Sequence, residues 1–101
     1  MKLIFKWNLQ KETYNKKAHS NIDFKEASTV FLYDGNLFTI YDEKHSTEIE
    51  DRWITIGLGK NGRLLVVVHT HEQIDEINTE IRIISARKAL KNEIKQYRGE
   101  K

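Results

Sequence analysis

Residues 52–70 read Arg52-Trp53-Ile54-Thr55-Ile56-Gly57-Leu58-Gly59-Lys60-Asn61-Gly62-Arg63-Leu64-Leu65-Val66-Val67-Val68-His69-Thr70, and this stretch decides the fold. Two runs rich in β-branched and apolar residues, 52–58 and 64–70, flank the segment 59–62. That segment ends in Asn-Gly, the strongest short signal for a β-hairpin, because both residue types tolerate the backbone that the turn requires. Positions 64–68 do not alternate between apolar and polar residues, which favours a central strand covered on both faces. The sequence therefore predicts a hairpin inside a sheet.

The residues before this hairpin predict two strands and two helices. Apolar residues at positions 3, 5 and 7 alternate with their neighbours, the period of a half-buried strand. Asn8 is suited to cap a short helix that runs to about residue 18, and Asp23 with Glu26 resembles the capping box of a second helix. The second helix has one apolar face, formed by Phe24, Ala27, Val30 and Phe31. Turn residues at 34–36 then precede a strand at 37–41.

The remaining segments complete the order of elements. We expect an acidic loop at 42–51, a long polar hairpin loop at 72–79 and a last strand at 81–85. At Ser85 or Ala86 the chain is expected to enter a final helix, whose apolar side consists of Ala89, Leu90, Ile94 and Tyr97. The order β-α-α-β-β-β-β-α predicts an α+β fold, a mostly antiparallel sheet with helices packed on one face.

The composition limits the class of protein. A length of 101 residues is that of one domain, so residues 1–101 are expected to form a single domain. The absence of cysteine excludes disulfides, iron–sulfur clusters and thiolate zinc sites, and it suits a reducing cytosol. The longest apolar run, 64–68, is far shorter than the roughly 20 residues of a membrane helix, and the N-terminal apolar stretch is too short for a secretory signal. We therefore expect a cytoplasmic protein without a membrane partner.

The charges are segregated along the chain, although the net charge is only +2. Residues 1–26 carry six lysines against three acids, residues 27–81 four bases against ten acids, and residues 82–101 seven bases against two acids. Because attraction of a polyanion depends on local charge, basic ends around an acidic middle indicate a phosphate-binding face. The alternative interpretation is a solvated helix face.

The strongest local candidate for a site is the run Arg82-Ile83-Ile84-Ser85-Ala86-Arg87-Lys88-Ala89. Two arginines and a lysine lie beside the expected start of the last helix, where free backbone amides and the helix dipole favour an anion. Arginine adds bidentate contacts to phosphate oxygens. The alternative is an ordinary cationic junction that pairs with acids such as Glu48, Glu50 or Asp51.

The pair His69 and His71 is a weaker candidate. The two residues are two positions apart on an expected strand, so their side chains point the same way and suit a metal site with a third ligand. We prefer the interpretation that one partly exposed strand face tolerates imidazole, because no third ligand is evident. The sequence also contains no glycine-rich phosphate loop, no Gly-x-Ser-x-Gly elbow and no His-Glu-x-x-His motif.

These residues resemble the BrnT family of ribonuclease toxins, the toxin halves of type II toxin–antitoxin pairs. The similarity covers nearly the whole chain and is most specific in the run 82–89. Its other elements are Phe5-x-Trp7-Asn8-x-x-Lys11, Asn15, Lys17 and His19, Phe24-x-x-Ala27, His45, Glu50-x-Arg52, Ile56-Gly57, Leu65 to Thr70, Glu93 and Tyr97. In the segment 17–21 one extra residue separates the lysine from the histidine that are adjacent in the Lys-His-Gly of the family, and the loop 72–79 is longer and more acidic than usual.

The resemblance implies a fold similar to the RelE superfamily and endonucleolytic RNA cleavage without a metal or other cofactor. It further implies inhibition of translation and neutralisation by a BrnA-type antitoxin, with two toxins bound to two antitoxins. Operator DNA would be contacted only through the antitoxin.

Metal-free RNA cleavage requires a base for the ribose 2′-hydroxyl, cations for the charge on the phosphate and an acid for the departing 5′-oxygen. His19 is a candidate for the base or the acid, and Glu50 is either a base or a residue that orients an arginine. Arg52, Arg82 and Arg87 are candidates for holding the scissile phosphate. Lys17 and Lys88 are expected to bind flanking phosphates.

Aromatic residues are candidates for stacking bases, although at strand and helix spacing they more often belong to a core. For Tyr14 and Trp53 both roles remain possible, base stacking or packing in the core, whereas Trp7 is assigned to the core. Two rival functions also remain, a non-catalytic RNA-binding module that uses the same basic face and a purely structural partner protein. If the protein is an RNA-binding module, it binds RNA and substitution of Glu50 or His19 changes no catalytic activity. If it is a structural partner, neutralising Arg82 and Arg87 changes nothing that involves nucleic acid.

Overall fold

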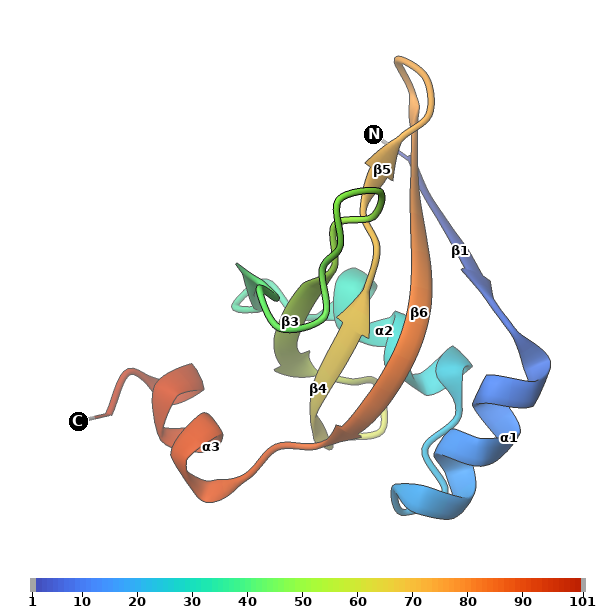
Figure 1. Cartoon of the computed structure of the whole chain (residues 1–101). Coiled ribbons are helices and arrows are strands. Elements are labelled where there is room, and N and C mark those ends of the chain that lie inside the picture. Colours follow the sequence, from blue (N-terminus) through green and yellow to red (C-terminus); the bar gives the residue numbers. More distant parts are fainter. Residues whose placement is uncertain (1, 101) are drawn as a thin grey trace.

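The structure is a computed structural model that describes residues 2–100. It consists of a mixed β-sheet with helices around it (Figure 1). The elements in chain order are β1 Lys2–Trp7, α1 Leu9–Ala18, α2 Phe24–Tyr33, β2 Phe38–Tyr41, β3 Trp53–Leu58, β4 Leu64–His69, β5 Glu72–Gln73, β6 Asn78–Lys88 and α3 Lys91–Arg98. The sheet order is β1-β6-β4-β3-β2, and β5 also pairs with β6. Only the β1–β6 pairing is parallel among the described strands. The predicted α+β fold with a mostly antiparallel sheet is confirmed.

The predicted hairpin is β3 and β4, which pair in register from Trp53 with His69 to Leu58 with Leu64. In its turn Gly62 has a φ of 82°, the left-handed backbone that glycine adopts without strain, and its amide donates to the carbonyl of Gly59. Strand β4 lies between β3 and β6. It is therefore an interior strand, as its unbroken apolar run predicts.

Both predicted helix caps are present. The side chain of Asn8 accepts from the amide of Lys11 at 3.0 Å, and that of Asp23 accepts from the amide of Glu26 at 2.7 Å. The side chain of Glu26 does not complete the expected capping box. It instead accepts from Arg63 Nε at 2.8 Å, which ties the start of α2 to the β3–β4 turn.

The hydrophobic core lies between α2 and one face of the sheet. The buried residues are Ile22, Phe24, Ala27, Val30, Leu65, Val67, Ile81, Ile83 and Ala86, and Leu3, Phe5, Trp7, Phe31 and Leu37 pack against them. Trp7 thus belongs to the core, as predicted. The helix comes close to β3 at Gly57, where an added Cβ would lie 2.5 Å from Val30 Cγ1.

Two expectations about the C-terminal half are wrong. The last strand does not end at Ser85, because β6 continues through Lys88 and α3 begins only at Lys91. The loop 72–79 is also shorter than expected, since Glu72 pairs with Glu80 and Gln73 pairs with Thr79. In both places pairing with the rest of the sheet outweighs the local pattern, because strand partners satisfy the backbone hydrogen bonds of polar residues.

Candidate functional site

A β-bulge in β6 determines which side chains share a face of the sheet. His69 pairs with Ile83 but Val68 pairs with Ser85, so Ile84 is an extra residue in β6. Before the bulge Ile83 faces the core, and after it Ala86 does. Because side chains alternate along a strand, Arg82 lies on the face opposite α2, and the bulge brings Ser85 and Arg87 to this same face. We call this surface, which carries Arg82, Ser85 and Arg87, the arginine face.

A carboxylate holds two arginines together at one end of the arginine face. Glu50 Oε2 accepts from Arg82 Nη2 at 2.7 Å, and Glu50 Oε1 accepts from Arg52 Nε at 3.0 Å. We call Glu50, Arg52 and Arg82 the Glu50 cluster. The hydrogen bonds from Arg82 and then from Arg52 hold the pKa of Glu50 below its usual range, so this carboxylate is ionised at neutral pH.

The acidic loop 42–51 positions Glu50. The hydroxyl of Ser46 accepts from the amide of Arg52 at 2.8 Å and donates to its carbonyl at 3.2 Å. The amide of Asp42 also donates to the carbonyl of Arg52, at 2.9 Å, and the side chain of Asp42 binds His45 Nδ1 at 2.8 Å. The loop is thus folded back on the start of β3, which fixes the place from which Glu50 reaches β6.

A cavity of about 260 Å³ lies beside the Glu50 cluster. Its lining includes Glu50, Thr70, His71 and Arg82. The sequence interpretation considered His71 only as half of a metal pair and did not connect it with Glu50 or Arg82. No sequence signal could make this connection, because it depends on the pairing of β6 with the segment that follows β4.

Arg87 lies on the same face but not in the Glu50 cluster. It is five residues from Arg82, roughly 16 Å along a strand. Its guanidinium forms a bidentate pair with Glu93 of α3, at 2.7 and 2.8 Å. This pair holds the pKa of Glu93 below its usual range, and Glu93 Oε1 also accepts from the amide of Leu90 at 2.7 Å. Arg87 therefore anchors the first turn of α3 in this structure.

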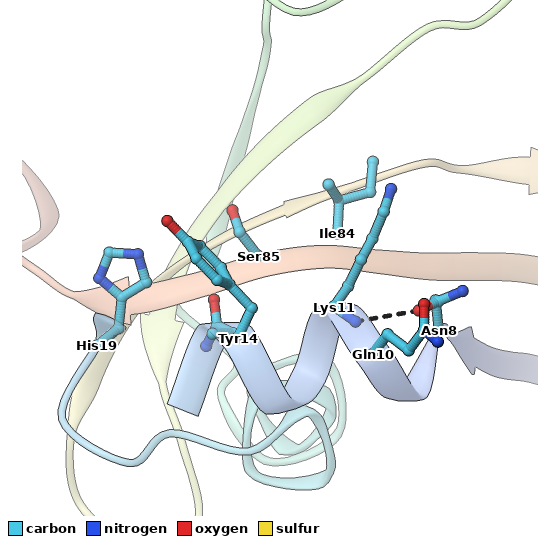
Figure 2. A pocket seen from close by; sticks show the side chains of 8 residues that line it. Asn8, Gln10, Lys11, Tyr14, His19, Ile84 and Ser85 are labelled. Atoms are coloured by element: carbon cyan, nitrogen blue, oxygen red, sulfur yellow. Dashed lines mark hydrogen bonds between the residues drawn. The ribbon is translucent and has the colours of Figure 1, made fainter. Parts of the chain in front are cut away.

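The other predicted site residues are spread around α1 and the end of β6. His19 is the C-cap of α1 and lines a second cavity, of about 460 Å³ (Figure 2). Lys17 lines a separate hollow with Thr13, Lys16 and Asn21. Lys88 is exposed at the end of β6. The structure therefore brings Glu50, Arg52 and Arg82 into contact, and it places His19, Lys17, Arg87 and Lys88 outside that contact.

The expected anion site at a helix N-terminus is not formed. Arg82, Arg87 and Lys88 belong to a strand, and α3 starts three residues after Lys88. The pairing of this run with Glu50, which the sequence offered as the alternative, is present at Arg82. What gathers the arginines on one face is the bulge, not the dipole of a helix.

The interpretation of His69 and His71 as one partly exposed face is wrong for His69. That side chain is 1% exposed, with Nε2 2.6 Å from the hydroxyl of Thr55 and Nδ1 2.8 Å from the carbonyl oxygen of Thr70. Burial lowers its pKa to about 4, so it is neutral at neutral pH. Within residues 2–100 the structure contains no cluster of three or more histidine, aspartate or glutamate side chains that could hold a metal ion.

Fold and site together define a small α+β protein that presents carboxylate-bound arginines on one face of its sheet, an arrangement suited to phosphate groups. The family model for the ribonuclease toxin BrnT of type II toxin–antitoxin systems matches residues 7–93. The chain belongs to this family of ribonuclease toxins, which act in pairs with an antitoxin protein. The search of curated proteins gave no match. Among the described residues, no helix has the length and apolar character needed to cross a membrane.

Proposed function

We propose that the chain is a metal-independent endoribonuclease whose cleavage of RNA in the cytoplasm inhibits translation. The observation that carries this proposal is the Glu50 cluster, in which one carboxylate at the end of the arginine face binds both Arg52 and Arg82. A guanidinium binds two phosphate oxygens in the geometry with which it binds a carboxylate. Glu50 thus occupies the position of a phosphodiester when RNA is absent.

The same exchange gives Glu50 a second role. When a phosphate takes the two arginines, the hydrogen bonds that lower the pKa of Glu50 are lost, and its pKa rises toward the ordinary value of a carboxyl group. Glu50 then lies beside the bound phosphate as a stronger base for the ribose 2′-hydroxyl. Arg52 and Arg82 stabilise the charge that develops on the phosphate in the transition state.

The departing 5′-oxygen needs a proton donor, for which histidine is suited at neutral pH. His71 lines the cavity of the Glu50 cluster, and His19 lines the neighbouring cavity across the bulge. We assign the acid to His71 and keep His19 as the competing candidate. Alanine variants at the two positions decide between them when the RNA is saturated with protein, because under that condition loss of the acid slows cleavage and a loss of affinity alone does not.

The remaining cations are assigned to flanking phosphates. Arg87, once released from Glu93, and the exposed Lys17 and Lys88 extend the positive surface away from the Glu50 cluster. Each contact with a single strand is expected to add roughly 0.7 to the slope of log affinity against log salt concentration. Replacing Lys88 by alanine would therefore reduce the salt dependence of binding without abolishing cleavage.

The partner is proposed to be a BrnA-type antitoxin, in a complex of two toxins and two antitoxins. The family requires an antitoxin, and the acidic segment 27–81 suits a basic partner protein. Operator DNA is then contacted through the antitoxin alone. Co-expression of the two chains with size-exclusion chromatography and light scattering measures this stoichiometry directly.

The deciding experiment is cleavage of a long single-stranded RNA by the purified protein in excess chelator. Arg82→Ala is expected to reduce the rate about a hundredfold or more, because it removes a contact to the transition state. Arg98→Ala, an exposed arginine of α3, is the matched control and is expected to cleave normally. Equal cleavage by all three proteins would show a contaminant, and activity lost in chelator would disprove metal independence. RNA binding without cleavage, unaffected by Glu50→Gln, would instead support the non-catalytic module.

A further inference from the structure

Helix α1 has a surface that the core does not use. Asn15 is the only buried residue of its ten, whereas Leu9 is 72% and Tyr14 74% exposed. A short polar helix gains little stability on its own, so most of the free energy that holds a helix in a protein comes from packing. Helix α1 instead forms one side of the open cavity of about 460 Å³, and the bulge of β6 forms another.

The cavity is lined by one aromatic ring, one aliphatic side chain and several polar groups. Figure 2 shows Tyr14 and Lys11 on the helix and Ser85 and Ile84 on the strand, with His19 at one end of the group. Its volume falls in the range of about 300–1,000 Å³ that small-molecule pockets occupy. The space therefore suits a flat, largely apolar ring with polar atoms at its edge.

Of the polar side chains that line the cavity, one forms hydrogen bonds that hold the fold together, and several others have no such partner among the described residues. Asn15 is fully engaged, since its Nδ2 donates to the carbonyls of Ala86 and Ile22 and its Oδ1 accepts from the amide of Ala86. Within residues 2–100, the side chains of Lys11, Tyr14, His19 and Ser85 form no hydrogen bond or ion pair with one another or with other residues. Asn15 thus holds α1 against β6, and the other four side chains are free to bind a ligand.

The position of the cavity identifies the kind of ligand. Ser85 lies on the arginine face two residues from Arg87, about 7 Å along the strand, and three residues from Arg82 on the other side of the bulge. A nucleotide chain with one phosphate at the Glu50 cluster thus has this cavity beside it. Aromatic rings that carry unpaired bases and cations that hold the adjoining phosphates are the usual means of binding single-stranded RNA.

We propose that this cavity is a nucleobase subsite, in which Tyr14 stacks on the base of a nucleotide next to the cleaved bond. The inference rests on the proposed ribonuclease function and adds the part of the surface that recognises sequence. Ser85 and His19 contact the edge of the base, and Lys11 contacts the phosphate that joins it to the strand. Because a stacked base can be read only at its edge, the subsite gives a base preference at one position near the cut.

The test uses hexanucleotides of 2′-O-methyl RNA, which bind but lack the nucleophile for cleavage. Tyr14→Ala is expected to weaken their binding about tenfold or more, the usual loss for one stacked base, and Tyr14→Phe to keep nearly all of it. Tyr33→Ala is the matched control, because Tyr33 is 63% exposed but lies at the end of α2 and contacts Lys60. Alanine is the best helix former, so Tyr14→Ala is expected to fold, and NMR spectra of the backbone amides verify this.

Backbone amide shifts on adding the hexanucleotide locate the bound strand. Shifts at Tyr14, His19 and Ser85 that disappear in Tyr14→Ala support the subsite, including the case in which no cleavage of ordinary RNA is found and the ribonuclease proposal fails. Shifts confined to Arg82 and Glu50, with equal binding by Tyr14→Ala and wild type, would overturn the subsite and leave the ribonuclease proposal in place. Absence of any binding by the wild type would overturn the subsite, whereas the ribonuclease proposal is decided by the cleavage of long RNA.

Discussion

Acidification between pH 7 and pH 5 is expected to destabilise the fold through one buried side chain, His69. The imidazole is 1% exposed, and both ring nitrogens are engaged, one by the hydroxyl of Thr55 and the other by the carbonyl of Thr70. Its ring also packs edge-on against Phe31, with centroids 4.9 Å apart. Protonation of the imidazole in the folded protein is therefore unfavourable, because the charge would be buried.

The magnitude follows from the two pKa values. The pKa of His69 is about 4 in the folded protein, lowered mainly by burial, and 6.5 is the ordinary value that applies to the unfolded chain. Between these values the unfolded chain binds more protons, so this contribution to the free energy of unfolding is present above pH 6.5 and is lost as the pH falls toward 4. Linkage gives a loss of about 2 kcal/mol between pH 7 and pH 5.

Urea unfolding at pH 7, 6 and 5 measures the effect, and His69→Gln is the control. Glutamine does not titrate, so the variant retains only the pH dependence of the other groups, and the wild type should lose about 2 kcal/mol more than the variant. The carboxylates with lowered pKa values, such as Glu50 and Glu93, act below this window. Equal losses in the two proteins, or an imidazole of His69 that titrates near pH 6.5 by NMR, would refute the reasoning.

Three further substitutions test the packing around the site. Asn15→Ala leaves the amide and carbonyl of Ala86 without partners, and we expect thermal or urea unfolding to show a loss of about 3 kcal/mol. Gly57→Ala forces a Cβ against Val30 and should cost about 1–3 kcal/mol, whereas Gly35→Ala, with open space around it, should cost far less; equal effects would contradict the close approach of α2. Tyr97→Phe removes the 2.7 Å hydrogen bond to Asp34 and should cost about 1 kcal/mol, with faster amide exchange in α3; unchanged exchange would show that this bond does not hold the helix.

The sequence predicted the fold well where a local signal coincides with the tertiary structure. The hairpin of β3 and β4 and the caps at Asn8 and Asp23 depend on residues within a few positions of one another. The end of β6 does not depend on such local residues, because pairing with β4 holds Ala86, Arg87 and Lys88 in the strand. Positions 85–88 have a helix-like composition, and only the partner strand decides against the helix.

The sequence offered Glu50, Arg52 and Arg82 as candidates, but it did not predict that the three side chains would be in contact. Glu50 contacts Arg82 across 32 positions of sequence, and no spacing rule connects the two. The bulge at Ile84 is equally invisible in the sequence, although it decides that Arg82 and Arg87 share a face. Alternation in a regular strand would place them on opposite faces, because their positions differ by an odd number.

The amide of Asn15 also has a consequence for how these molecules behave in a crowded solution. Strand β1 covers the outer edge of β6 as far as Ile83, and beyond it the side chain of Asn15 takes the amide and the carbonyl of Ala86 as a neighbouring strand would. An open strand edge is a template on which a second chain can add and start aggregation. One side chain thus covers this edge at Ala86, two residues before β6 ends, and local unfolding of α1 would open that position to a second molecule.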